Sequence, residues 1–175
     1  MAEVHIIGQI DYAEDFLAPN LLCKFGVSAG NNWKLIGGHQ EGQTHVSSDI
    51  DQKNVAFCHP IDLHYLVKGI QGWPKLFFEI WSYNQYSKCE IMGYGFCHVP
   101  TTPGFHKLKI NMWKPVGNFF EQFTSSKVGG CLILQKPNVI YEPQERFYLK
   151  TSTSGTLNIK INVISRNFRS FGIHI

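Results

Sequence analysis

The feature that most constrains the fold is a pair of strongly apolar segments joined by a short polar one. In residues 75–81 every even position is apolar, and the odd positions still include Phe77 and Trp81. The second segment is 93–100, and the turn-prone residues 82–88 connect the two. We predict two paired core strands, and because the first is apolar on both faces, the rest of the chain must cover both.

Short apolar runs recur along the remaining chain, separated by many of its 16 glycines and 8 prolines. The clearest is 157–163, where four apolar residues alternate with polar ones, and residues 106–112 repeat this pattern. Further strands are predicted at 3–10, 21–27, 33–36, 55–65, 131–134 and 146–150. This spacing is typical of an all-β, antiparallel sandwich of about eight strands.

Two segments are less regular. The polar stretch 39–54 is either a surface loop or a weak edge strand. A short helical turn, the only helix predicted, begins at Asn118 and continues through Phe123.

Composition excludes several classes of protein. With 175 residues and 43% hydrophobic residues, the chain suits a single domain, 1–175, with a core at about 3–165 and a C-terminal extension. A net charge of +3 is too small to indicate a surface that binds nucleic acid. The N-terminus lacks a basic region followed by an apolar one, and the five cysteines are an odd, widely spaced set. We therefore expect an intracellular protein with reduced thiols.

Candidate catalytic and ligand-binding residues are sparse. Cys58-His59 and Cys97-His98 are adjacent pairs, whose side chains point to opposite faces of a strand, so neither pair predicts a nucleophile or a zinc site. Asp49 and Asp51 provide too few oxygens for calcium. The four tryptophans either fill the core or line a groove for sugar or peptide. We expect no catalytic residue, no metal site and no cofactor.

Several longer motifs resemble the B9-domain family along nearly the whole chain. They are residues 41–44, 59–64, 68–76, 93–100 and 166–168. The resemblance implies a non-enzymatic, C2-like β-sandwich related to calcium- and lipid-binding domains.

The resemblance also implies a location and a role. Members of the family are components of the tectonic-like, Meckel-syndrome complex at the ciliary transition zone, where they support cilium assembly and the barrier to membrane-protein diffusion. We therefore expect a protein of the cytoplasm, cytoskeleton, basal body and transition zone that binds other B9-domain proteins. Tubulin at the basal body and a calcium-independent membrane contact are further expected partners.

The sequence departs from calcium-binding C2 relatives in one loop. In those relatives two acids follow a strand that ends in tryptophan, whereas Trp81 is followed by Ser82 and Asn84 at the corresponding positions. Neutral oxygens do not supply the charge that offsets dehydration of a divalent cation. Any membrane contact is therefore expected to be independent of calcium.

The C-terminal segment gives the candidate partner-binding residues. Arginine and phenylalanine alternate there, and both types are enriched among interface anchors. These residues are Arg166, Phe168, Arg169 and Phe171. Local packing over the end of the sandwich is the competing interpretation. Two other functions stay open: a phospholipid- or sugar-binding sandwich that does not need calcium, and a cysteine-dependent enzyme.

Overall fold

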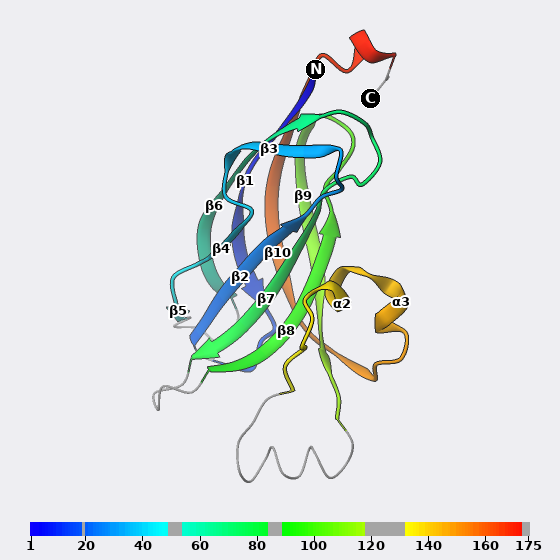
Figure 1. Cartoon of the computed structure of the whole chain (residues 1–175). Helices are drawn as coiled ribbons and strands as arrows, with labels where there is room; N and C mark the ends of the chain where they lie inside the picture. The colour runs from blue at the N-terminus through cyan, green and yellow to red at the C-terminus, as the bar shows by residue number, and fades with distance from the viewer. Residues whose placement is uncertain (19, 49–53, 84–88, 118–131, 173–175) are drawn as a thin grey trace.

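Figure 1 shows the computed structural model, which describes residues 1–18, 20–48, 54–83, 89–117 and 132–172. Ten antiparallel strands dominate these residues. They are β1 (Ala2–Glu14), β2 (Asn20–Ser28), β3 (Trp33–Gly38), β4 (Glu41–Gln43), β5 (Ser47–Ser48), β6 (Asn54–Val67), β7 (Lys75–Tyr83), β8 (Cys89–His98), β9 (Gly104–Pro115) and β10 (Thr151–Arg166). Short helices follow β9 and β10: α2 (Asn138–Tyr141), α3 (Pro143–Arg146) and the 3-10 helix η1 (Arg169–Phe171).

The strands pair in the order β3-β6-β1-β10-β9-β8-β7-β2-β4, with β5 beside β2. A single residue pair, Tyr94 and Trp113, joins β8 to β9, whereas β9 and β10 pair along most of their length. The sheet folds over at this weak junction, so that β2, β7 and β8 lie in front of β6, β1, β10 and β9 in Figure 1. The predicted antiparallel sandwich is confirmed.

The core lies between these two layers and follows the alternation of the sequence. Ile6 of β1, Leu63 of β6 and Ile161 of β10 point inward from one layer, and Leu76 and Phe78 of β7 point inward from the other; all are at most 2% exposed. Strand 157–163 is confirmed, since its four alternating apolar residues are all buried.

The outer face of β7 and β8 is also covered, as the apolar odd positions of β7 predicted. Helix α2 places Ile140, which is fully buried, against Ile91 and Tyr94. The ring of Tyr141 packs 5.4 Å from that of Phe77. A segment far along the chain therefore covers this side of the sandwich.

The structure decides several local predictions. The stretch 39–54 contains edge strands, β4 and β5, which was one of its two interpretations, and the described residues hold ten strands where about eight were predicted. The strand predicted at 146–150 is wrong: Arg146 ends α3, and the next residues turn with Phe147 and Tyr148 85% and 87% exposed. Residues 132–134 are not a strand either.

The helix predicted from Asn118 to Phe123 lies outside the described residues. The prediction of a single helix is wrong, because α2, α3 and η1 all lie elsewhere. Within the described ranges, no helix has the length and apolar character needed to cross a membrane.

Candidate partner-binding surface

The outer face of the layer formed by β6, β1, β10 and β9 is not covered by any helix in the described part of the chain. Strand register fixes which side chains are neighbours on this surface, which we call the outer face. His5 lies between His64 of β6 and Ile164 of β10. One row further, Ile7 and Phe105 of β9 lie on either side of Asn162. These residues point away from the core because their strands alternate.

Three large apolar side chains gather on this outer face. Ile7 is 44% exposed, Phe105 is 61% exposed and Ile164 is 45% exposed. We call them the apolar triad. An outward position on a sandwich strand is usually polar, and exposed apolar side chains that cluster mark interaction sites more often than chance.

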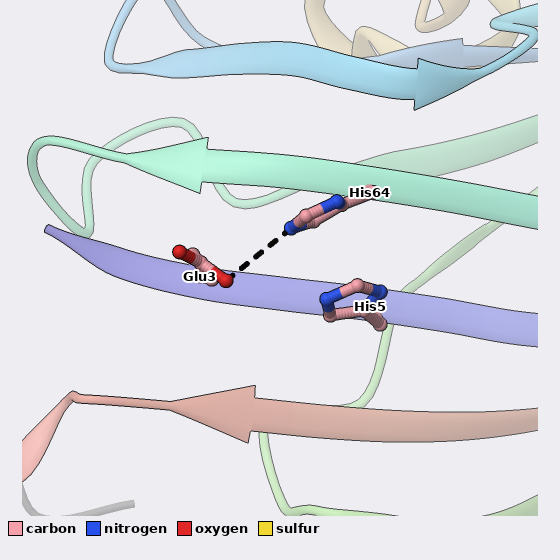
Figure 2. A group of neighbouring side chains, drawn as sticks. All are labelled: Glu3, His5 and His64. Atoms are coloured by element: carbon pink, nitrogen blue, oxygen red, sulfur yellow. Dashed lines mark ion pairs between the residues drawn. The ribbon is translucent and has the colours of Figure 1, made fainter.

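A polar cluster of Glu3, His5 and His64 adjoins the triad. The rings of His5 and His64 stack with their centroids 3.6 Å apart and an interplanar angle of 21°. Nε2 of His64 lies 3.5 Å from Oε2 of Glu3, as the dashed line in Figure 2 shows. All three side chains are partly buried.

The four residues predicted from the C-terminal segment occupy different environments. Arg166 lies on the outer face opposite Glu3, with its guanidinium 3.9 Å from the carboxylate. Phe168 is 4% exposed and belongs to the core, whereas Arg169 and Phe171 lie in the exposed η1. Phe171 lines a pocket together with Met1 and Val67. The structure therefore separates one packing residue, Phe168, from three accessible ones.

The loop expected to have lost a calcium site is only partly described. Ser82 belongs to β7 and pairs with Leu21 of β2, while Asn84 lies outside the described residues. The adjacent Trp81 ring is held in place, because its indole N–H donates to Glu79 at 3.0 Å and the Lys24 ammonium lies 4.8 Å from the ring centroid.

The cysteines do not form a nucleophile with a neighbouring base among the described residues. Burial raises the pKa of the Cys97 thiol to about 12, and burial together with the nearby Glu79 carboxylate raises that of Cys23 still further. A catalytic thiol requires the opposite shift. Cys58 and Cys89 are exposed, and Cys131 lies outside the described residues.

This difference in burial predicts the pattern of thiol modification. We expect iodoacetamide at neutral pH to alkylate Cys58 and Cys89 in the native protein, and to leave Cys23 and Cys97 unmodified until the protein unfolds, because only the thiolate reacts. Peptide mass spectrometry after a timed reaction measures this. Rapid native labelling of Cys23 or Cys97 would contradict the burial described above.

Sequence reasoning missed the apolar triad and the polar cluster. One signal was present: Ile7 and Ile164 occupy positions that strand alternation assigns to solvent. The polar cluster had no local signal, because His64 is brought to Glu3 and His5 only by the pairing of β6 with β1.

The chain is similar to members of one protein family over nearly its whole length. A family described as ciliary basal body-associated B9 proteins, B9-C2, matches residues 4–164. The chain is 43% identical over 173 residues to "B9 domain-containing protein 2" of Homo sapiens, with 99% of each chain covered. It is 24% identical to "B9 domain-containing protein 1" of Xenopus laevis, over 97% of this chain and 87% of the relative. A solved C2A domain of a plant extended synaptotagmin 1 aligns over 93% of both chains with a TM-score of 0.46 and 14% identity.

Proposed function

The chain belongs to the B9 family of ciliary basal body-associated proteins, and we propose that it is a non-enzymatic structural component of the tectonic-like, Meckel-syndrome complex at the ciliary transition zone. In this role it supports cilium assembly and the barrier to membrane-protein diffusion by binding other B9-domain proteins. The family match over residues 4–164 also supports the expectation of one domain with a core at about 3–165.

One observation carries the binding proposal: the two outer faces of the sandwich differ. The chain covers the outer face of β7 and β8 with its own helix α2. On the opposite layer it exposes Ile7, Phe105 and Ile164, and no helix of the described residues covers them. Burial of such side chains is favourable by about 25 cal/mol per Å² of apolar surface. A second B9-domain protein is the occupant we propose, with Arg166 at the rim of the contact and η1 at its end.

Affinity purification tests the proposed function in cells. The tagged chain is expressed in ciliated cells of its own organism, and the captured proteins are scored for other B9-domain proteins by mass spectrometry. We expect these proteins, including the counterpart of B9 domain-containing protein 1, to be enriched over a tag-only control. Localisation at the basal body without any B9-domain protein in the captured fraction would contradict the proposal. Tubulin among the captured proteins would support the second expected partner.

A second function, calcium-independent contact with membranes, is favoured by a specific feature. Phe147 and Tyr148 form an adjacent exposed aromatic pair between α3 and β10, with ring centroids 5.7 Å apart. Lys150 follows them, and aromatic side chains beside basic ones suit the boundary between lipid headgroups and acyl chains. Co-sedimentation with phosphatidylserine vesicles in EDTA, compared with the double variant Phe147→Ser and Tyr148→Ser, separates this function from protein binding.

A further inference from the structure

We propose that Glu3, His5 and His64 form a binding site for one divalent transition-metal ion, with zinc as the expected occupant. The site adjoins the protein contact proposed above, but it requires only side chains of this chain. It also departs from the sequence-based expectation that the chain holds no metal.

The first support is the convergence of three ligand atoms. A carboxylate oxygen of Glu3 and one ring nitrogen of each histidine all lie within 4.8 Å of one another. Zinc with bonds of about 2.1 Å holds its ligand atoms roughly 3.4 Å apart. Figure 2 shows that both imidazoles turn a nitrogen toward the side on which Glu3 lies. The two imidazole planes are stacked and only 21° from parallel, so closing the remaining gap requires both partly buried rings to rotate until their nitrogen lone pairs converge on one ion.

The second support is the state of the His64 nitrogen. Nε2 of His64 is buried and makes no hydrogen bond, even though Glu3 lies 3.5 Å away. A buried polar atom without a partner is unfavourable, because it has lost its hydrogen bonds to water. A metal bond would give this nitrogen the partner that it lacks.

The third support is the framework that carries the ligands. His5 and His64 are direct cross-strand partners on β1 and β6, and Glu3 is two residues from His5 on the same face. Cross-strand neighbours hold their Cβ atoms about 4.5–5.5 Å apart. The backbone of two long paired strands therefore fixes the distance between the histidines before any ion binds.

The donor set indicates which ion binds. Two imidazoles and one carboxylate match a zinc site with a fourth position open to water, whereas calcium requires six to eight oxygen ligands. Arg166, whose side chain is 72% exposed, lies 3.9 Å from the Glu3 carboxylate. Its exposure allows it to move to solvent when an ion takes its place.

The test is a zinc titration by calorimetry of the folded, full-length protein. Exposed thiols are first alkylated with iodoacetamide, so that Cys58 and Cys89 cannot bind the metal. We expect the alkylated protein without further substitutions to bind one zinc ion per chain. His64→Ala and, separately, His5→Ala should weaken zinc binding at least about tenfold, as expected for loss of a ligand, and Glu3→Gln should weaken it while preserving side-chain size.

Matched controls make the outcome decisive. His98→Ala removes an exposed histidine at the end of β8, in the other layer, and should leave the affinity unchanged. Calcium titrated into the same protein should give no heat of binding. A shift in melting temperature with zinc provides a second readout, expected in wild type and lost in His64→Ala and Glu3→Gln. Absence of zinc binding, or equal affinity in wild type and all three ligand variants, would overturn the proposal.

Discussion

Replacing Phe78 by alanine is expected to lower the free energy of unfolding by about 3–5 kcal/mol. The Phe78 side chain is fully buried between the two layers, opposite Phe25 of β2 and Gly95 of β8. Truncation removes a large apolar side chain from the middle of the sandwich and leaves a cavity, which neighbouring strands paired on both sides cannot easily close. Equilibrium urea denaturation, followed by tryptophan fluorescence, measures the change.

Trp81→Ala is the matched comparison on the same strand. Its ring lies on the side of β7 that α2 covers and is only half-buried. We therefore expect a smaller decrease in the free energy of unfolding, of about 1–2 kcal/mol. The two variants thus distinguish the inter-layer core from the smaller cluster under α2. A Phe78→Ala protein with an unchanged urea midpoint would show that the ring is not where the described packing puts it.

The double substitution Phe105→Asp and Ile164→Asp is expected to abolish capture of the partner B9-domain protein. Truncation of a central interface anchor commonly costs about 2 kcal/mol or more, which corresponds to roughly a 30-fold loss of affinity. A carboxylate at each position adds the cost of burying an unpaired charge. Co-purification from ciliated cells, quantified against wild type, provides the measurement.

Two controls distinguish loss of contact from loss of fold. Val46→Asp replaces an apolar residue of similar exposure, 49%, between β4 and β5 of the other layer, and should retain the partner. The melting temperature of the double variant should stay close to that of wild type, because both substituted side chains point to solvent. Full recovery of the partner by a folded double variant would rule out the triad as its binding surface.

Much of the fold was predictable because strand alternation is a local property. The buried side of 157–163 was identified from its period-two pattern, and the paired segments 75–81 and 93–100 from their apolar runs and the turn-prone residues between them. The burial of both faces of β7 was also predictable, since Phe77 and Trp81 are apolar on the face that a sandwich strand usually exposes to solvent.

Other features were not predictable because they depend on distant pairing or on local competition. The run 146–150 contains apolar residues typical of a strand, yet Pro143 begins a helix just before it and β9 already pairs with β10. Phe168 resembled an interface anchor, but its side chain is buried and packs in the core. The polar cluster arises only when β6 brings His64 across to His5.

The partner-binding residues named from sequence need a revised test in view of these positions. Phe168→Ala would disturb the core and confuse instability with loss of contact. Arg169 and Phe171 are both exposed in η1, so substitutions there report on binding with little effect on packing. Arg166 lies on the outer face between Ile164 of the apolar triad and η1 along the chain.

Direct titration of two purified proteins tests the central claim, that this chain acts by binding another B9-domain protein through its outer face. The chain is titrated with the counterpart of B9 domain-containing protein 1 from the same organism, and affinity and stoichiometry are measured by calorimetry. We predict saturable binding by wild type and by Val46→Asp, and at least a 30-fold weaker interaction for the Phe105→Asp and Ile164→Asp variant. Equal affinity for all three proteins, or no binding by wild type, would contradict the account.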